Sequence, residues 1–265
     1  MQTRMLTGAA ALALEILALA ATPGHADQAT ACTMDEFCYC VNSDLRGAIE
    51  QHVDFIRTRI AEEKAKGKAV GYLSIPLSTV GGSYLNVNLE VAGEVKQWVE
   101  NRLGVRAAWL LNPGAKETAL PGNASGADYM LMWTKVLEGR DGLGDFDFVY
   151  FVGPADFARH FGLDGNGDLD KLENTYDALA KTDGGLKAVD RRAFRDYYAL
   201  RASGAYSFGS HDEWNIVRMI NQRRREADSK LGIAKQMGVF FDGRPVAPGL
   251  FEAPISPGDV GPCRN

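Results

Sequence analysis

The sequence predicts an α/β fold in which helices cover both faces of an open, mostly parallel sheet. Short apolar and β-branched runs alternate with longer segments whose apolar residues recur every three to four positions. The apolar runs are closed by Gly, Pro or Asn, which are the residues that end strands. Strands that alternate with helices are joined by right-handed crossovers, so neighbouring strands are expected to be parallel.

The first half of the chain supplies the alternation. Its expected elements are a helix over 44–66, a strand over 69–77, a helix over 85–103, a strand over 107–111, a helix opened by the capping-box spacing of Ser125 and Asp128, and a strand over 146–152. The last strand is almost wholly apolar, as expected for a strand that is covered on both faces.

The alternation stops after residue 154. Residues 156–205 are polar, favour helix in two or three pieces, and contain no convincing strand. We therefore expect one α/β domain over 27–265 with a helical insertion at about 156–205. The core resumes with a helix through Trp214 that ends in the basic run at 223–225, for which a solvated helix end is the simplest interpretation. A last short strand is expected at 238–241.

The first 26 residues have the pattern of an export signal. Arg4 precedes a nearly continuous apolar run, and small residues at 24–26 suit a signal peptidase. No later stretch has the ~18 uninterrupted apolar residues that a membrane helix needs. We expect an exported protein, periplasmic or secreted, that begins near Asp27 and has no membrane partner after cleavage.

The overall charge argues against a nucleic-acid partner. The chain carries 29 Lys+Arg against 34 Asp+Glu, a net charge of −5. A field of this sign attracts neither polyanionic nucleic acid nor acidic lipid.

Four cysteines remain after the expected cleavage: Cys32, Cys38, Cys40 and Cys263. An even number in an oxidising compartment predicts two disulfides. Because three of the four lie near the N-terminus, a complete pairing must join the two ends of the chain. Pairing of Cys38 with Cys40 is least favoured because one intervening residue strains the bridge. A metal site is the weaker alternative, since structural zinc usually uses Cys-x2-Cys pairs.

A series of short motifs resembles a known family. The series is the segment 71–78 with sequence GYLSIPLS, then Asn86, then Leu111-Asn-Pro113, then Tyr129 before the strand at 148–151, then Ser207-x-Gly-Ser-x-x-Glu213. Over 71–154 and 207–221 this order is similar to that of nucleoside 2-deoxyribosyltransferase-like proteins. The resemblance implies a flavodoxin-like or Rossmann-like sheet and the hydrolysis or transfer of an N-glycosidic bond between a base and a sugar.

The resemblance also implies site residues. It makes Glu213 the nucleophile, and a carboxylate there can attack the anomeric carbon while the base departs. Asp128 and Asp156 are the two candidates for the acid that protonates the leaving base. The expected ligand is nucleoside-like or nucleotide-like, and no cofactor is required. Its contacts are expected from strand-end loops, namely Ser74, Pro76, Ser78, Asn86, Ser207, Gly209 and Ser210.

Two alternatives stand beside this function. Ser210 and Glu213 have capping-box spacing, in which Glu213 would stabilise a helix start by about 1 kcal/mol. The family also often carries an aspartate where this chain has Met132-Trp133-Thr134, so the chain departs from the family pattern at this position.

The alternative function is a non-catalytic exported binding protein for a nucleotide-like or sugar ligand.

An acidic loop supplies a candidate calcium site. Asp164, Asn166, Asp168 and Asp170 place oxygen ligands at alternate positions, as in the first half of an EF-hand loop. The sixth position is Leu169 in place of glycine, and the twelfth is Thr175 in place of glutamate. A calcium loop and a solvated acidic turn therefore both remain open.

Overall fold

The computed structural model describes residues 27–77, 80–231, 235–255 and 261–264, so the expected export signal and Ser78 lie outside the described residues. It contains a five-stranded sheet in the order β4-β3-β5-β6-β7. The strands β3 (Ala69–Ser74), β4 (Ala108–Leu111), β5 (Phe148–Phe151) and β6 (Gly238–Phe241) pair in parallel, and β7 (Arg244–Pro245) is antiparallel. The expected open, mostly parallel α/β sheet is confirmed.

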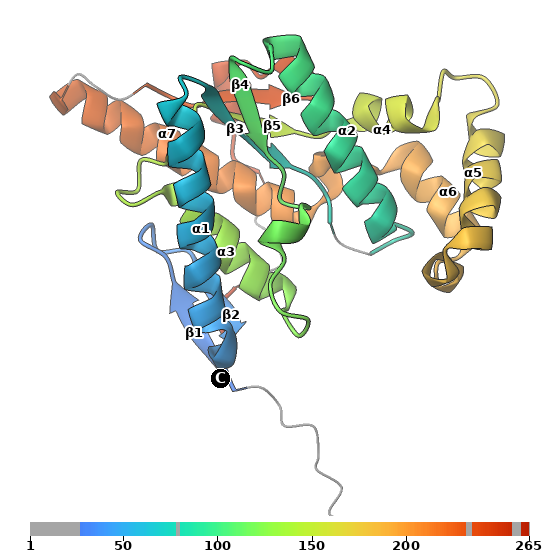
Figure 1. The fold of residues 1–265 in the computed structure, drawn as a ribbon, viewed down its shortest axis with the longest axis horizontal. Coiled ribbons are helices and arrows are strands. Elements are labelled where there is room, and N and C mark those ends of the chain that lie inside the picture. The colour runs from blue at the N-terminus through green and yellow to red at the C-terminus, as the bar shows by residue number, and fades with distance from the viewer. Residues whose placement is uncertain (1–26, 78–79, 232–234, 256–260, 265) are drawn as a thin grey trace, which may run out of the picture.

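Helices cover both faces of this sheet (Figure 1). The helices α1 (Arg46–Ala65), α3 (Gly126–Glu138) and α7 (Phe208–Leu231) pack on one face, and α2 (Leu85–Leu103) packs on the other. Strand side chains alternate between the two layers, because successive residues of a strand point to opposite faces. Tyr72 and Phe151 face α3 and α7, whereas Leu73 and Tyr150 face α2.

The polar segment after β5 is helical, as expected. It contains α4 (Pro154–Phe161), α5 (Asp168–Thr182) and α6 (Arg191–Leu200). Figure 1 shows α5 and α6 side by side and away from the sheet. The chain then returns to the sheet, where the Gly204 amide donates to the Val152 carbonyl at 2.8 Å.

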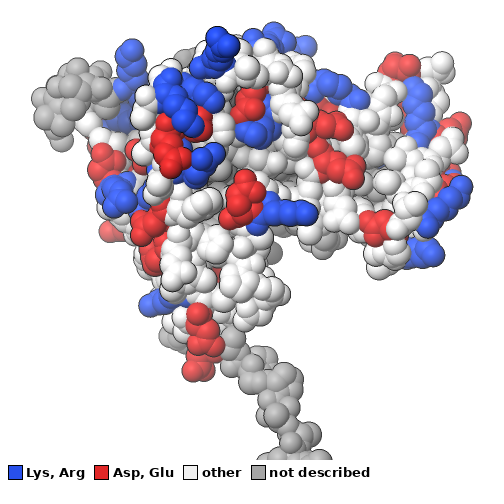
Figure 2. Space-filling view, in the orientation of Figure 1, with Lys and Arg blue, Asp and Glu red and all other residues white. Residues whose placement is uncertain are grey.

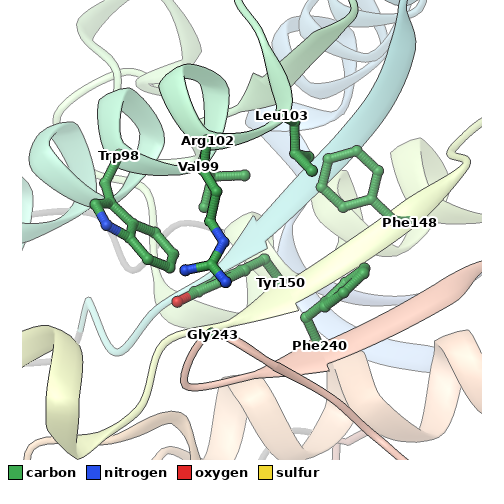
Figure 3. Close-up of a pocket in the computed structure, with 8 residues that line it drawn as sticks. All are labelled: Trp98, Val99, Arg102, Leu103, Phe148, Tyr150, Phe240 and Gly243. Atoms are coloured by element: carbon green, nitrogen blue, oxygen red, sulfur yellow. The ribbon is translucent and has the colours of Figure 1, made fainter.

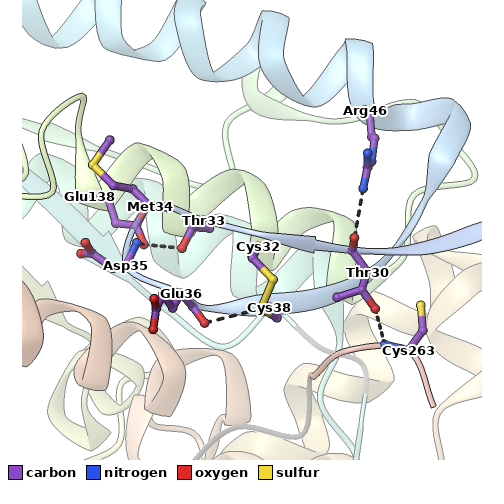
Figure 4. Close-up of a disulfide and its surroundings, with 10 residues drawn as sticks. All are labelled: Thr30, Cys32, Thr33, Met34, Asp35, Glu36, Cys38, Arg46, Glu138 and Cys263. Carbon is purple, nitrogen blue, oxygen red and sulfur yellow. Dashed lines mark hydrogen bonds between the residues drawn. A yellow bond between two sulfur atoms is a disulfide. The ribbon is translucent and has the colours of Figure 1, made fainter. Parts of the chain in front are cut away.

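Sequence analysis missed an N-terminal hairpin of β1 (Gln28–Cys32) and β2 (Cys38–Asn42). One disulfide, Cys32–Cys38, closes the hairpin, and Cys40–Cys263 joins the two ends of the chain. Figure 4 shows the hairpin bridge and the hydrogen bond from the Cys263 amide to Thr30 Oγ1, which is 3.1 Å long. The expected pair of disulfides, with one bridge between the chain ends, is therefore confirmed.

The basic run at 223–225 is not a solvated helix end. Arg224 is 8% exposed and donates to four carbonyl oxygens, those of Leu143, Gly144, Phe146 and Lys235. Arg223 pairs with Asp35 of the hairpin, and Arg225 pairs with Glu252. A guanidinium carries five donors in a fixed fork, so one arginine can hold several loop carbonyls in place before β5.

Short helical turns complete the described chain: η1 (Ser43–Leu45), η2 (Lys116–Thr118), η3 (Gly184–Ala188), η4 (Gly204–Tyr206) and α8 (Pro248–Phe251). Within the described ranges, no helix has both the length and the apolar character needed to cross a membrane. Figure 2 shows positive and negative side chains interspersed on the visible face. Oppositely charged residues form ion pairs, such as Lys135 with Glu50.

Candidate functional site

The candidate site lies at the carboxyl ends of β3 and β5, where the order of the strands in the sheet changes direction: β4 lies on one side of β3 and β5 on the other. The chain runs from β3 to β4 through α2 on one face of the sheet, and from β4 to β5 through α3 on the other. The carboxyl ends of β3 and β5 therefore form the topological switch point, which is where open α/β sheets bind ligands. Glu213, in the second turn of α7, reaches the end of β3 at this point.

Two hydroxyl groups of β3 hold the Glu213 carboxylate. Tyr72 donates its phenol proton to Oε1 at 2.5 Å, and Ser74 donates its hydroxyl proton to Oε2 at 2.5 Å. Residues two apart on a strand share a face, so the strand presents both donors to α7. Each carboxylate oxygen thus has its own donor, and the side chain is fixed in one orientation.

The surroundings of Glu213 are apolar. The residue is 6% exposed, and Tyr72 contacts the rings of Trp133 and Phe146 at centroid separations of 5.8 and 5.6 Å. Burial raises the pKa of Glu213 to about 7, the hydrogen bonds from Ser74 and Tyr72 oppose the rise, and the charge of Asp212 adds to it. A carboxyl group with this pKa exchanges a proton near neutral pH, as acid–base catalysis requires.

Glu213 does not act as a helix cap. The cap of α7 is Ser207, whose Oγ accepts from the Ser210 amide at 3.3 Å and whose carbonyl accepts from the His211 amide at 3.0 Å. The capping interpretation of Ser210 and Glu213 is therefore wrong, because α7 begins three residues earlier than that spacing assumes. The Glu213 carboxylate instead accepts hydrogen bonds from Tyr72 and Ser74 of β3.

Ser210 has an unsatisfied hydroxyl in this region. It is 3% exposed, and its Oγ has no hydrogen-bond partner among the described residues. Gly204 lies against it, because a Cβ on Gly204 would come within 3.6 Å of Ser210 Oγ and 3.3 Å of the Val152 carbonyl. A buried hydroxyl without a partner has a free-energy cost that a bound ligand would relieve.

Asp128 lies at the hairpin anchor. It is fully buried in the first turn of α3, where it forms a capping box with Ser125 and accepts from the amide and side chain of Asn42. These bonds fix the end of β2 to the start of α3. The structure therefore gives this carboxylate a structural set of partners.

Asp156 lies on the other side of the sheet. It is 1% exposed and accepts from the Tyr150 hydroxyl, with both oxygens at 3.0 Å, and from the Gly153 amide at 3.1 Å. Tyr150 faces α2, whereas Glu213 faces α7. Burial raises the pKa of Asp156, and the bonds from Gly153, Tyr150 and Arg159 oppose the rise. The structure therefore does not bring this candidate acid together with Glu213.

The other expected ligand contacts divide into two groups. Ser74, Ser207, Gly209 and Ser210 lie at the end of β3 and the start of α7. Asn86 instead is exposed and binds Asp183 at 2.8 Å. Near the Pro76 loop, the fully buried Asn88 donates to the carbonyl of Pro76 and to Ser83, so it holds the chain that follows β3. The residue of the Glu213 site that the sequence analysis missed is Tyr72.

Thr134 occupies the segment where the family often carries an aspartate. Its Oγ1 lies 2.7 Å from the Tyr39 hydroxyl of the hairpin, and both side chains are buried. Burial raises the pKa of Tyr39, and the carboxylates of Asp212, Glu138 and Glu213 add to the rise. The disulfide-closed hairpin therefore extends to the neighbourhood of Glu213.

Lys171 lies in the acidic loop. Its ammonium lies 2.6 Å from Asp164 and 3.4 Å from Asp168, and Asp168 also accepts from the amides of Asp164 and Gly165. The bond from Lys171 lowers the pKa of Asp164. Asn166 contributes its amide to Asp164, and Asp170 is exposed on α5. Within the described ranges, no group of three or more His, Cys, Asp or Glu is placed to hold a metal ion.

No family model, curated protein or solved structure matches this chain. By its fold and its site, the protein belongs to the class of open α/β proteins, and it has a buried glutamate at the switch point of its sheet.

Proposed function

We propose that the protein is an N-glycoside hydrolase or transferase that acts on a nucleoside-like or nucleotide-like substrate, with Glu213 as its nucleophile. One observation carries the proposal. Tyr72 and Ser74 fix the Glu213 carboxylate at the switch point of the sheet, with one hydroxyl donor on each of its oxygens.

The chemistry uses the ionised carboxylate. An oxygen of Glu213 forms a bond to the anomeric carbon while the C–N bond breaks, and the electron pair of that bond leaves with the base, which takes up a proton from solvent. A water molecule then attacks the same carbon, the ester bond to Glu213 breaks, and the carboxylate is regenerated as the water loses a proton. A second base in place of water gives transfer instead of hydrolysis.

The rim of the site suits a flat base. Tyr206 and Phe208 flank the helix-capping Ser207 and are 69% and 59% exposed. Exposed aromatic side chains beside a ligand site offer stacking surfaces to a nucleobase. Glu213 itself is almost fully covered, so substrate access requires movement of the segments that pack around it.

The test is release of free base from a panel of nucleosides, nucleotides and NAD, measured by chromatography. We expect release by the wild-type protein and a loss of at least about a hundredfold in Glu213→Gln, because the nucleophile is removed. Glu138→Gln is the matched control. Glu138 is 1% exposed, and burial raises its pKa as well, but its oxygens bind Thr33 and the amides of Met34 and Asp35 at the hairpin.

Retained activity in Glu138→Gln together with loss in Glu213→Gln supports the proposal. Turnover that survives in Glu213→Gln contradicts it. The alternative is a non-catalytic binding protein for a nucleotide-like or sugar ligand, and it predicts ligand-dependent rises in melting temperature without base release.

We also propose that the protein is exported to the periplasm or secreted after cleavage before Asp27. The two disulfides support an oxidising compartment. Mass spectrometry of the protein from its native host tests this. A mature chain that begins near Asp27 without free thiols is expected, and an intact N-terminus on the mature protein contradicts the proposal.

A further inference from the structure

The strand β4 forms one outer edge of the five-stranded sheet, and β3 is its neighbour on the inner side. The Ala107 carbonyl points towards β3, where it accepts from the Ala69 amide at 2.8 Å. Because the backbone groups of successive residues in a strand point to opposite edges, those of Ala108 and Leu110 point away from the sheet. Outward-pointing amides and carbonyls of this kind can pair with a strand of another molecule.

Two side chains of α2 satisfy both outward groups of Leu110. Glu100 Oε1 accepts from the Leu110 amide at 2.9 Å, and Lys96 Nζ donates to the Leu110 carbonyl at 2.6 Å. Lys96 and Glu100 also form an ion pair with each other, one helical turn apart, and the Lys96 ammonium lies 5.3 Å from the centre of the Trp109 ring. The pair therefore supplies the acceptor and the donor that a further strand would supply.

The orientation of α2 places this pair beside β4. Figure 3 shows Trp98 and Arg102 on the flank of α2 that lies over Tyr150 of β5. Residues two apart on a helix point in directions that differ by about 160°, so Lys96 and Glu100 lie on the opposite flank. The packing of α2 against β5 and β6 thus fixes the position from which the two charged side chains reach the sheet edge.

Other outward groups near the β4 edge are satisfied by the chain's own turns. The Ala108 amide donates to the Gly104 carbonyl at 3.0 Å, and the Asn112 carbonyl accepts from the Ala115 amide at 3.2 Å. The strand β7, at the opposite edge of the sheet, has only two residues, and one of them is Pro245, which has no amide hydrogen. On β4, therefore, the central residue Leu110 depends on the side chains of α2.

The sequence of β4 makes an open edge adhesive. Its four residues, Ala-Trp-Leu-Leu over 108–111, are all apolar. Apolar strands without charge or proline pair readily through a free edge. Two copies of one edge that are related by a two-fold axis pair in antiparallel orientation, so a second copy of this chain is the partner that fits.

We propose that Lys96 and Glu100 keep the protein monomeric by closing the β4 edge against a second copy of this chain. The ion pair satisfies the Leu110 amide and carbonyl within the molecule. It also places two charges where the partner strand would lie, and pairing would have to strip them of water. The proposal is independent of the glycosidase proposal, because it concerns the edge of the sheet and none of the contacts of Glu213.

Sedimentation velocity of the folded, disulfide-bonded protein tests the proposal. We expect the wild-type protein to be monomeric at about 100 μM, and Lys96→Ala with Glu100→Ala to form dimers with a micromolar dissociation constant. The control is Glu50→Ala with Lys135→Ala. It removes an ion pair of the same two charges that joins α1 to α3, so it should stay monomeric.

Hydrogen exchange of the Leu110 amide identifies the surface that pairs. At about 1 μM, where copies are apart, this amide should exchange at least about tenfold faster in the double variant than in the wild-type protein, and at about 100 μM pairing should slow it again. Glu100→Ala alone frees the same amide, and it is measured in the same two ways if the double variant does not fold.

Three results overturn the proposal. One is a variant that keeps the wild-type melting temperature and stays monomeric at the higher concentration. Another is a dimer in which the Leu110 amide remains unprotected, because such a dimer uses a different surface. The third is a wild-type protein that dimerises as readily as the double variant.

Discussion

At the scale of single residues, the Glu213 site depends on the two-residue period of a strand. Tyr72 and Ser74 share the face of β3 that meets α7, and each satisfies one carboxylate oxygen. Sequence motifs identified Glu213 and Ser74 but not Tyr72, whose hydroxyl lies within an apolar run. The signal that was available is its spacing of two from Ser74.

The raised pKa of Glu213 predicts a pH-dependent effect of substitution on stability. The carboxyl titrates near 7 in the folded protein and near 4.5 when unfolded. Between these values the folded state holds the proton more tightly, so stability falls as the pH rises through this window and then levels off. Glu213→Gln removes the buried charge and should raise the free energy of unfolding at pH 8 by up to about 3 kcal/mol, with little change at pH 4.5.

Urea unfolding at the two pH values measures this effect. Glu63→Gln is the control of opposite sign, because the bonds from Lys66 and Lys68 lower the pKa of Glu63 to about 2. The stabilisation that ionised Glu63 contributes is fully present above the pKa that Glu63 has in the unfolded chain. It is lost as the pH falls through the lower pKa that Glu63 has in the folded protein. This control should therefore lose stability at pH 8. A Glu213→Gln protein that is equally stabilised at both pH values would contradict the prediction.

At the scale of elements, the long periodic segments were predictable and the short ones were not. The helices α1 and α2 and the strand β6 were found within about two residues because their apolar patterns are strong. The expected strand over 69–77 ends at Ser74, because its partner β5 ends at Phe151. The hairpin β6–β7 was missed, although Asp242-Gly243, with φ values of +52° and +79°, is a typical two-residue hairpin turn.

The acidic loop gives a prediction at this scale. Lys171 supplies the positive charge between Asp164 and Asp168, so calcium has to displace a tethered ammonium to enter. Neither EDTA nor millimolar calcium should change the melting temperature of the wild-type protein, measured by calorimetry. Lys171→Gln is the comparison, because it leaves the loop carboxylates without their cation and should make the melting temperature rise with calcium. A calcium-dependent rise in the wild-type protein would show that the ion binds despite Lys171.

At the scale of the whole molecule, the disulfides hold the N-terminal hairpin against the α/β core. The hairpin contacts α3 through Thr33 and Glu138, and α7 through Asp35 and Arg223. Cys40–Cys263 closes a loop with a sequence separation of 223, whereas Cys32–Cys38 has a separation of 6. A longer loop restricts the unfolded chain more strongly.

Removal of the two bridges should therefore have unequal effects. In the chain-entropy model, Cys40→Ala with Cys263→Ala lowers the free energy of unfolding by about 5 kcal/mol, and Cys32→Ala with Cys38→Ala lowers it by about 2 kcal/mol. Urea unfolding without reductant measures both double variants. An equal or larger loss from the short bridge would show that its native contacts, and not the entropy of the unfolded chain, dominate.

The sequence by itself determined the α/β class, the order of the main strands and helices, the helical segment after β5 and the presence of a bridge between the chain ends. These features follow from local periodicity, turn residues and cysteine count, which do not depend on distant contacts. The tertiary structure decided which disulfide partners meet, that Asp156 lies on the other face of the sheet from Glu213, and that Tyr72 joins Glu213. Those outcomes depend on which face each strand residue takes and on how elements far apart in the chain pack together. The local pattern records which residues of one strand share a face, but not which distant element that face meets.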